Sequence, residues 1–583
     1  MIYSQKLAVE LDEQSLTYCE LLYYVQVLSL TLLNEYRVNV GDIICQCVER
    51  SISMVIGIMA IEMVGGVYCP LSPRDPPHRL HSLFEQIESR IVLVESSTKS
   101  KFNDVIITCH INLILFIDVI MYRIIENRLS NVIITPDCIA YIIFTSGSTG
   151  MPKAVRIRHR NFSEHMHSFI GAKILAESDT VIQMSRYSFD IHIHEILGLL
   201  SKGVTLVMLH PQETFDFDYL SKVLYDKQIT YIHTVPSLLF HFFTFINQSN
   251  MHHAVKYLRS LFGSEFNDHL VREYNRMKCN IWNIYGPTET TVVSTIHLLN
   301  QMIETENISI GRPLPNYRHL LLDIHLQRVV INQEGELFVG GIGIFASYLG
   351  RDDLTAQALI EIDGDINYRT GDMVKMDFNG NLNYQGRKDF QVKLHGQRIE
   401  LGEIERCLLN HLVAYVQSSV VSEKELHEYC QSHLPPHMIP SYFIILDKLP
   451  LNPNGKIDRK RLPSPDSLVL SSTKLNNTND LVEPTNKIES IIHHIWCDLL
   501  KQKQISTNTN IFSIGGHSLI IMQLLHHYKV EFRLEINSIA ITDLFQHPTI
   551  IDHAKLIHQI LNTELSKDDH SWHSLNILTG NKY

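Results

Sequence analysis

The segment from Phe144 to Val155, FTSGSTGMPKAV, gathers residues that can hold a phosphate group. Its two glycines allow a tight backbone turn that brings several N–H groups onto one anion. Hydroxyl groups add further donors, and Lys153 adds a positive charge. The turn residues are Thr145, Ser146, Gly147, Ser148, Thr149 and Gly150. The Walker spacing G-x-x-x-x-G-K-[ST] is absent, so this is a different kind of phosphate loop; the alternative is an ordinary Ser/Gly turn.

The loop resembles the phosphate loop of the adenylate-forming superfamily, which comprises acyl-CoA ligases, luciferases and the adenylation domains of nonribosomal peptide synthetases. Further family motifs occur in the family's order: LTYCEL (16–21), GGVYCPLSP (65–73), SFDIHIHE (188–195), NIYGPTET (283–290), GELFVGGIGIFASYL (335–349), YRTGD (368–372), GRKDFQVKLHGQRIELGEIE (386–405) and NPNGKIDRKRL (452–462). IFSIGGHSL (511–519) resembles the phosphopantetheine-attachment motif of a carrier protein. A carrier after an adenylation domain is the arrangement of a nonribosomal peptide synthetase, not of a free acyl-CoA ligase.

The resemblance implies a reaction that joins a carboxylate to the α-phosphate of ATP and expels pyrophosphate. Because two anions meet, positive charge and Mg²⁺ must lie where negative charge develops. By resemblance, the 145–150 loop and Lys153 hold the β- and γ-phosphates. Glu289 matches the magnesium-binding carboxylate, and Thr288 matches the threonine at the α-phosphate. Taken alone, Glu289 could equally be a surface carboxylate.

The same resemblance assigns residues to the nucleoside and to the adenylation step. Tyr285 matches the aromatic residue that stacks on adenine, and Asn283 belongs to the same ATP-binding motif. Asp372 matches the carboxylate that accepts hydrogen bonds from the ribose hydroxyls. Arg387 matches a second contact to ribose or phosphate. Lys456 matches the lysine that bridges the substrate carboxylate and ATP, although in isolation it could be an ordinary turn residue.

The resemblance also implies that the small C-terminal part rotates between two poses, about a hinge in the segment that matches Asp389. In the first pose Lys456 enters the site. In the second, the thiolation loop from Lys393 to Gly396 faces it, and the pantetheine thiol attacks the acyl-adenylate. Ser518 matches the serine that carries the 4′-phosphopantetheine arm; its structural alternative is a helix N-cap.

Asp190 matches the aspartate that pairs with the α-amino group in amino-acid-activating members, so an α-amino acid is the expected substrate. The motifs also imply a wall around the substrate side chain, formed by Ile191, His194, His233, Ser260, Phe262, Ile284, Val292 and Val293. This wall is apolar with two histidines, which favours a medium-sized side chain with a polar or acidic end. His194 stands where many members carry a tryptophan, and the histidines could equally fill space.

The hydropathy pattern predicts the elements that position these residues. Up to about residue 380, short apolar runs alternate with amphipathic stretches, which predicts α/β layers with strands buried on both faces. Examples are RIVLVES (90–96), AYIIFTS (140–146), VTLVML (204–209) and YIHTVPS (231–237). The segment 386–405 predicts a hairpin and then a helix. Beyond residue 486, apolar residues at helical spacing in 488–500, and again just after Ser518, predict a helical block.

We therefore predict an α/β protein of several parts. They are a large adenylation N-terminal core at 1–385, a small α+β C-terminal subdomain at 386–463, a linker at 464–486, a four-helix peptidyl carrier domain at 487–560 and a tail at 561–583. Few residues separate Glu405 from Leu434, so we interpret the small subdomain as shortened. Either the subdomain is trimmed or the gene model lost an exon.

Composition excludes several other classes. The 583 residues carry a net charge of −12, which argues against general binding to nucleic acid or an anionic membrane. Ten cysteines are too few for a disulfide framework, so we expect reduced thiols in the cytoplasm. The most apolar stretch, 105–121, is shorter than the ~20 residues of a membrane span and favours buried strands. The N-terminus has no apolar signal-peptide core.

The main prediction is an adenylation and carrier didomain that uses ATP, Mg²⁺ and 4′-phosphopantetheine. It needs a phosphopantetheinyl transferase and, because it shows no condensation, thioesterase or dinucleotide-binding signature, a downstream condensation or reductase partner. One alternative is a fragment of an aminoadipate-reductase-like or amine-conjugating synthetase. A second is a degenerate, non-catalytic nucleotide-binding and carrier protein, which the shortened subdomain favours.

Overall fold

The structure is a computed structural model of the whole chain, and it divides into two compact units. The first comprises 1–211, 221–412 and 424–439, and the second comprises 212–220, 413–423 and 440–583. The residues that the structure describes are 3–102, 107–110, 129–145, 152–172, 174–211, 216–264, 279–299, 308–388, 391–394, 397–400, 407–408, 411–417, 425–426, 428–430, 442–446, 482–500, 502, 504–514, 518–532, 534, 539, 543–544 and 547–573.

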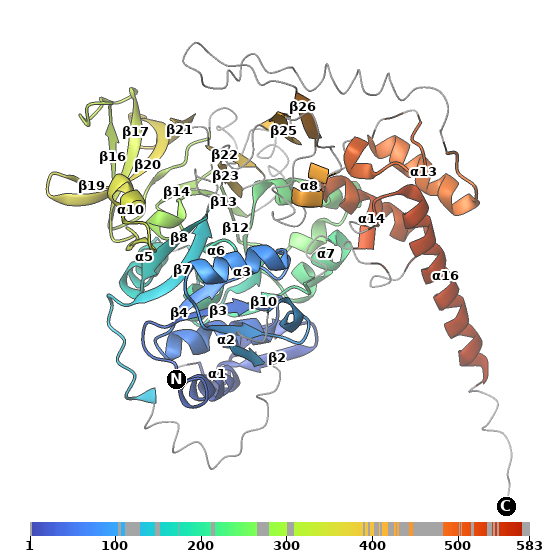
Figure 1. Cartoon of the computed structure of the whole chain (residues 1–583), viewed down its shortest axis with the longest axis horizontal. Coiled ribbons are helices and arrows are strands. Elements are labelled where there is room, and N and C mark those ends of the chain that lie inside the picture. The colour runs from blue at the N-terminus through green and yellow to red at the C-terminus, as the bar shows by residue number, and fades with distance from the viewer. Residues whose placement is uncertain are drawn as a thin grey trace, which may run out of the picture. The chain divides into compact units, whose positions relative to one another are not determined.

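Two large sheets form the centre of the first unit (Figure 1). The nine-stranded sheet has the order β15-β14-β13-β12-β11-β9-β10-β1-β2. Its strands are β1 (Leu7–Leu11), β2 (Gln14–Thr17), β9 (Thr180–Gln183), β10 (Thr205–Met208), β11 (Tyr231–His233), β12 (Ser260–Gly263), β13 (Asn280–Tyr285), β14 (Thr295–Leu298) and β15 (Arg312–Pro313). The strands from β1 to β13 in this order pair parallel, and antiparallel strands close both edges.

The seven-stranded sheet has the order β18-β8-β7-β4-β3-β5-β6, again with a parallel centre. Its strands are β3 (Ile43–Cys47), β4 (Val67–Pro70), β5 (Ile91–Val94), β6 (Ile107–His110), β7 (Ile139–Thr145), β8 (Lys153–Arg158) and β18 (Ser347–Tyr348). Strands β4 and β5 are buried along their whole length, because helices cover a parallel sheet on both faces. The α/β prediction is thereby confirmed.

All four example runs form strands, with one boundary corrected. The run 231–237 was expected as one strand, but β11 ends at His233 and helix α8 (Pro236–Gln248) follows. Proline is well placed at the first turn of a helix, where its missing N–H would have no partner. The apolar stretch 105–121 contains β6, which pairs parallel with β5; residues 111–121 lie outside the described part.

Helices in the first unit connect these strands. They are α1 (Tyr18–Asn34), α2 (Ile52–Met63), α3 (Pro77–Gln86), α5 (His159–Gly171), α6 (Ile191–Ile193), α7 (Phe217–Asp226), which begins in the second unit, α8 and α10 (Asp352–Ala358). Helix α1 begins with a capping box, in which the Thr17 hydroxyl accepts from the Glu20 N–H and the Glu20 carboxylate accepts from the Thr17 N–H. No helix among the described residues is long and apolar enough to cross a bilayer.

A smaller antiparallel sheet follows in the chain (Figure 1). It contains β16 (Tyr317–Leu322), β17 (Glu334–Gly341), β19 (Leu359–Ile362), β20 (Asp365–Met376) and β21 (Leu382–Arg387). Just after β21, Lys388 is held by an ion pair and by a backbone hydrogen bond. Its ammonium lies 3.0 Å from the Glu336 carboxylate, and its N–H donates to the carbonyl of Gly371 at 2.9 Å. The chain is therefore anchored up to residue 388.

The expected hairpin after residue 386 is present: β22 (Gln391–Leu394) pairs antiparallel with β23 (Gln397–Glu400). The helix expected next, at 401–406, lies outside the described residues. A two-residue strand, β24 (Cys407–Leu408), precedes β25 (His411–Gln417), which pairs parallel with β26 (Tyr442–Leu446). Between β25 and β26 the structure describes only 425–426 and 428–430, and the predicted linker lies outside the described residues up to residue 481.

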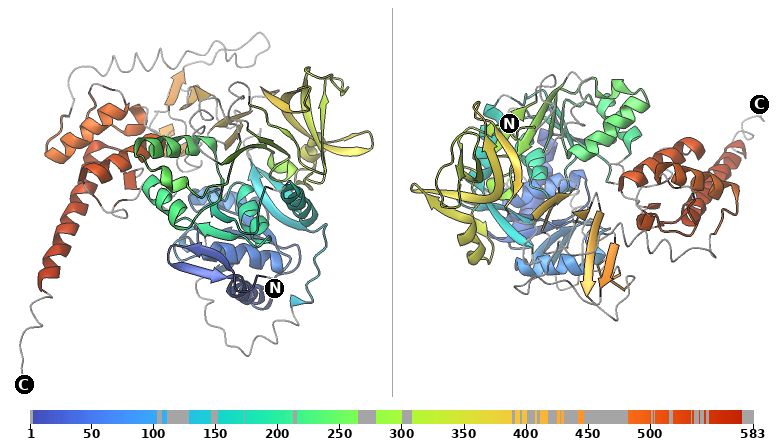
Figure 2. Two further views of the ribbon diagram at one scale, coloured as in Figure 1. Left: turned by 180° about the vertical axis from the view of Figure 1, so that it is seen from behind. Right: turned by 90° about the horizontal axis from the view of Figure 1, so that it is seen from above.

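The carrier region packs three described α-helices around one apolar core. They are α13 (Lys487–Leu500), α14 (Ser518–Phe532) and α16 (Ile550–His573). Both apolar-periodic runs of the sequence are helices, as predicted, while the fourth helix stays a prediction. The tail was expected from residue 561, but α16 continues to His573, and Figure 2 shows its C-terminal half extending past α13 and α14.

A buried polar chain crosses the carrier core. The indole N–H of Trp496 donates to the Tyr528 hydroxyl at 2.7 Å, and this hydroxyl lies 2.9 Å from Nδ1 of His553. Nε2 of His553 lies 3.3 Å from the carbonyl oxygen of Leu544. Because that carbonyl can only accept, Nε2 carries the hydrogen, and Nδ1 accepts from the tyrosine. A neutral His553 therefore satisfies every member of the chain.

We expect these hydrogen bonds to make the stability of the carrier region sensitive to acid. Burial is the main reason why the pKa of His553 falls from 6.5 to about 4. Between these values the unfolded state binds a proton that the folded state does not, so the free energy of unfolding should decrease by about 1–3 kcal/mol from pH 7 to pH 4. Urea unfolding of the full chain at a series of pH values, followed by tryptophan fluorescence, measures it. A His553→Gln variant should show a weaker pH dependence; an unchanged dependence would contradict the assignment.

Candidate active site

Three adjacent parallel strands deliver several predicted site residues to one edge of the nine-stranded sheet. In register, His233 of β11 lies beside Phe262 of β12, which lies beside Trp282 of β13. Asn283 and Tyr285 occupy the end of β13. In parallel α/β sheets, ligands bind at the carboxyl ends of the strands. This edge of the sheet is therefore the expected position of a ligand-binding site.

Asp190 lies beside this edge, directly before α6. Its carboxylate accepts a hydrogen bond from the N–H of Val292 at 3.2 Å, across 102 positions of sequence. Burial raises its pKa from 3.8 to about 6; Val292 and the Thr288 hydroxyl act in the opposite direction, and the nearby charge of Glu289 raises it further. None of the ion pairs within the described residues involves Asp190. The carboxylate is therefore buried without a cationic partner in this part of the chain.

The backbone around Asp190 is irregular on both sides. After α6, residues His194–Gly198 form one π-helical turn, a feature frequent at functional sites. Opposite, Thr291 and Val292 have φ angles of 58° and 66°. A β-branched residue is strained in this region, which persists only where the surroundings enforce it. Gly286 allows the turn, because a side chain there would clash with the backbone of residues 292–294.

The predicted side-chain wall is brought together around this point. The ring centres of His194 and His233 are 6.2 Å apart, and those of His233 and Phe262 are 6.0 Å apart. Burial lowers the pKa of both histidines from 6.5 to about 3, so both rings are neutral. Ser260, Ile284, Val292 and Val293 are also buried, and Ile191 is partly buried.

The predicted nucleoside contacts form a second cluster at the end of β13. The Tyr285 hydroxyl donates to one oxygen of Asp372, and Arg387 pairs with the other at 2.7 Å. Asp372 and Arg387 face each other across β20 and β21. The amide nitrogen of Asn283 donates to the Ser309 carbonyl at 2.7 Å, and its buried amide oxygen has no partner within the described part of the chain. This oxygen can accept from an exocyclic amine such as that of adenine.

The predicted phosphate and magnesium contacts form a third cluster. Thr145 and Lys153 face each other across β7 and β8, so the ends of the 146–151 segment are held together. The Lys153 ammonium lies 5.6 Å from the centre of the Tyr348 ring, whose hydroxyl donates to the fully buried carboxylate of Glu289 at 2.8 Å. The buried Thr145 hydroxyl has no hydrogen-bond partner among the described residues.

These groups fit an ATP–magnesium complex. No cluster of three metal-binding side chains occurs in the described segments. Mg²⁺ needs none, because it is commonly held by one or two carboxylates together with phosphate oxygens and waters. Glu289 offers such a carboxylate, beside the cation of Lys153.

Several predicted residues lie outside the described part. They are Ser146, Gly147, Ser148, Thr149, Gly150, Asp389, Gly396 and Lys456. Lys393 lies in β22, and Ser518 is the first residue of α14; of their side chains only the position along these elements is defined. Ser518 therefore stands at the N-terminal end of a helix.

Sequence analysis missed the contribution of Tyr348. It lies within the quoted motif 335–349, but nothing local indicates that its hydroxyl reaches Glu289, 59 residues earlier in the chain. Thr288, in contrast, interacts with the Asp190 carboxylate, which connects the predicted α-phosphate position to the predicted amino-group position.

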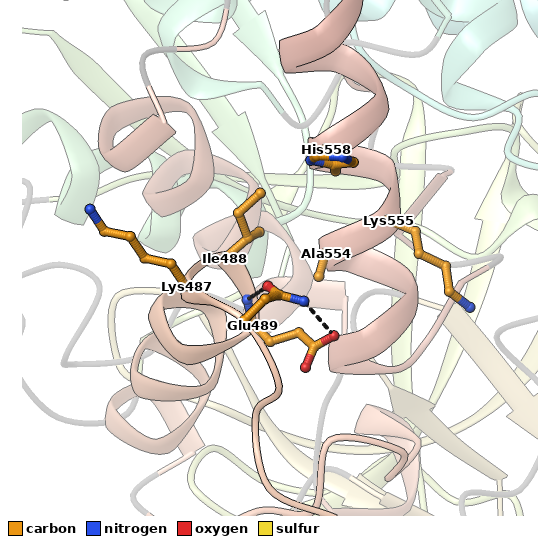
Figure 3. Close-up of a pocket in the computed structure, with 7 residues that line it drawn as sticks. Lys487, Ile488, Glu489, Ala554, Lys555 and His558 are labelled. Atoms are coloured by element: carbon orange, nitrogen blue, oxygen red, sulfur yellow. Dashed lines mark hydrogen bonds between the residues drawn. The ribbon is translucent and has the colours of Figure 1, made fainter.

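A separate hollow of about 460 Å³ lies in the carrier region, between α13 and α16 (Figure 3). It is lined by Asn486, Lys487, Ile488, Glu489, Ala554, Lys555 and His558. Figure 3 shows Lys487 and Lys555 pointing away from each other, and Asn486 pairs with Glu489 at 2.9 Å. It contains no predicted site residue.

Comparison with known families agrees with this geometry. The model of the AMP-binding enzymes matches residues 2–349, and the model of the phosphopantetheine attachment site matches residues 490–557. The chain belongs to the AMP-binding enzyme family and carries a phosphopantetheine-attachment domain, as the sequence motifs predicted.

Individual proteins show the same combination. Tyrocidine synthase 3 of Brevibacillus parabrevis is 33% identical over 579 residues, which cover 95% of this chain and 9% of that protein. Tyrocidine synthase 1 of the same organism is 30% identical, with 94% of this chain and 51% of the relative covered. The chain thus spans about a tenth to a half of these relatives. The fold matches holo-PA1221, a nonribosomal peptide synthetase protein with adenylation and carrier domains, with a TM-score of 0.76, 23% identity and coverage of 96% of this chain and 95% of that one.

Proposed function

We propose that this protein activates an α-amino acid as an aminoacyl-adenylate and transfers the aminoacyl group to a phosphopantetheine thiol on its own carrier domain. The observation that carries the proposal is the buried Asp190 carboxylate beside Thr288 and Glu289. A buried carboxylate with no cationic partner is costly, and the ammonium group of a bound amino acid would compensate it.

In this proposal the three clusters divide the work. Asp190 binds the ammonium group and so orients the substrate carboxylate toward Thr288. Asp372 and Arg387 hold the ribose, and Asn283 and Tyr285 hold the adenine. The 145–150 loop and Lys153 bind the outer phosphates. Mg²⁺ at Glu289 would neutralise charge on the phosphates when bound. The remaining proposed wall residues, among them Ile191, Ile284, Val292 and Val293, exclude water from the substrate side chain.

The proposed carrier step uses the second half of the chain. The hydroxyl of Ser518 carries the 4′-phosphopantetheine arm after modification by a phosphopantetheinyl transferase, and Lys393 and Gly396 lie in the loop that admits the thiol. A downstream condensation or reductase partner would use the loaded carrier. We place the reaction in the cytoplasm; eight cysteines whose side chains the structure describes are free thiols, which is consistent with a reducing compartment.

Exchange of labelled pyrophosphate into ATP, driven by a panel of amino acids, tests the adenylation step. The lysine at 456 should stabilise charge only in this step, so Lys456→Ala should lower the exchange rate by about 10²-fold or more. Transfer to the carrier from a supplied aminoacyl-adenylate should change much less. Equal losses in both half-reactions would contradict the two-pose mechanism.

A further inference from the structure

A row of hydrogen bonds leads from a backbone carbonyl to His194. The hydroxyl of Tyr317 lies 3.1 Å from the carbonyl oxygen of Thr290 and 3.1 Å from Nδ1 of His165. The other ring nitrogen of His165, Nε2, lies 3.3 Å from Nδ1 of His194. All four residues are buried. Gly343 makes room for the row, because a side chain at that position would collide with the Tyr317 hydroxyl and the Thr290 carbonyl.

Each link of this row has one hydrogen to share, so the row has a direction. A carbonyl oxygen can only accept, and the Tyr317 hydroxyl is the only donor to Thr290 among the hydrogen bonds of the described residues. The hydroxyl also lies 3.4 Å from the carbonyl oxygen of Thr291, so its hydrogen is directed to the backbone in either case, and Nδ1 of His165 must donate to the hydroxyl oxygen. Nε2 of His165 is then bare and accepts from Nδ1 of His194. The reverse direction would leave a buried carbonyl without a donor, which is unfavourable.

The direction of the row decides whether the second ring nitrogen of His194, Nε2, donates or accepts a hydrogen bond. Burial, together with the neighbouring His194, keeps the pKa of His165 well below its usual range, although a hydrogen bond to the backbone of Val293 acts in the opposite direction, and burial lowers the pKa of His194 to about 3. A neutral ring has one donor and one acceptor. Because Nδ1 of His194 is the donor, Nε2 of His194 presents a lone pair.

Three polar atoms of the proposed side-chain wall have no hydrogen-bond partner among the described residues, although they are shielded from solvent. They are Nε2 of His194, Nδ1 of His233 and Oγ of Ser260. Buried polar atoms are normally paired. Three unpaired atoms on the walls of one proposed pocket therefore indicate where a bound side chain completes hydrogen bonds.

We propose that the row makes His194 a fixed hydrogen-bond acceptor, so that the enzyme selects α-amino acids whose uncharged side chain ends in an amide or hydroxyl group. The inference rests on the proposed function, in which these atoms line the substrate pocket. The N–H or O–H of the ligand donates to Nε2 of His194, and its oxygen accepts from the Ser260 hydroxyl. A carboxylate has no hydrogen to donate, so the sequence-based expectation of a polar or acidic end narrows to a polar one. His165 and Tyr317 are positioning residues.

Pyrophosphate exchange by the full chain with matched amino acids tests this selection. The pairs are glutamine with glutamate, asparagine with aspartate, threonine with valine, and tyrosine with phenylalanine. We expect the best substrate to be the first member of a pair, with kcat/KM at least about 10²-fold above its partner. A preference for the second member of a pair, whether acidic or apolar, overturns the inference and leaves the proposed function standing. If none of the amino acids supports pyrophosphate exchange, the proposed function is overturned, and the inference with it.

Two variants distinguish an effect of the hydrogen-bond direction on selectivity from an effect of packing around His194. Tyr317→Phe removes the hydroxyl that sets the direction, so the preference within the best pair should fall by about tenfold or more. Phe169→Leu alters a ring 4.7 Å from His194 that is not part of the row, and it should affect both members of the pair equally. An unchanged preference in Tyr317→Phe would overturn the inference.

A direct measurement on the wild-type chain does not depend on how the variants fold. In a protein labelled with ¹⁵N-histidine, Nε2 of His194 should show the chemical shift of a bare nitrogen, assigned by its absence in His194→Phe. A shift typical of a protonated nitrogen at that position would overturn the inference.

Discussion

Asp190→Ala should abolish most activation of α-amino acids while sparing the corresponding acids that lack the amino group. Removing one partner of a buried ion pair costs about 3–5 kcal/mol, which corresponds to a loss of about 10²- to 10⁴-fold in kcat/KM. Pyrophosphate exchange with an amino acid and with its deamino analogue measures the two effects side by side. The ratio of kcat/KM for the amino acid to kcat/KM for its deamino analogue should fall toward one.

Asp190→Asn is the matched control, because the amide oxygen can still accept from the N–H of Val292. It keeps the shape and the local hydrogen bond and removes only the charge. We expect nearly the same loss of exchange as in Asp190→Ala. If the amide variant kept wild-type exchange, the carboxylate would not be pairing with an ammonium group.

Ser518→Ala should prevent loading of the carrier completely, because no other group on the chain is proposed to accept the arm. Coexpression with a phosphopantetheinyl transferase should increase the mass of the wild-type chain by one pantetheine arm. ATP and the correct amino acid should increase it again. Both increases should be absent in the variant, whereas pyrophosphate exchange should continue, because adenylation takes place on the other domain.

Ser513→Ala provides the control for this variant, since Ser513 belongs to the same sequence motif. Its mass increases should match those of the wild type. A wild-type chain that never takes up the arm would refute the carrier assignment but would leave the adenylation site untouched.

The features that sequence alone could predict are those with a local cause. Strands such as β5 are continuous apolar runs, and α13 has its apolar residues on one face, so both follow from periodicity. The end of α16 did not follow, because its last turns carry no apolar stripe and no stop signal before His573. Proline at 236 could have indicated the end of β11.

The candidate site also has some features that the sequence could predict and others that depend on the folded chain. Motif resemblance led to Asp190 and Val292, but that the carboxylate receives the N–H of Val292 depends on the folded turn. The positive φ angle of Val292 contradicts its local preference and is imposed by its surroundings. His165 and Tyr317 belong to no quoted motif, and they meet only because α5 and β16 are packed together. Contacts over such separations cannot be inferred from one sequence.

The double anchor at Lys388 offers a way to watch the proposed rotation. Since the Glu336 carboxylate and the Gly371 carbonyl hold this residue on the sheet that also carries Asp372, residues up to 388 form a stationary frame. Any part of the chain that rotates must therefore turn about a point beyond residue 388. A fluorophore on this sheet and a second one past residue 390 would therefore report the proposed rotation as a change in one distance, with the proposed ribose-binding carboxylate of Asp372 on the fixed side.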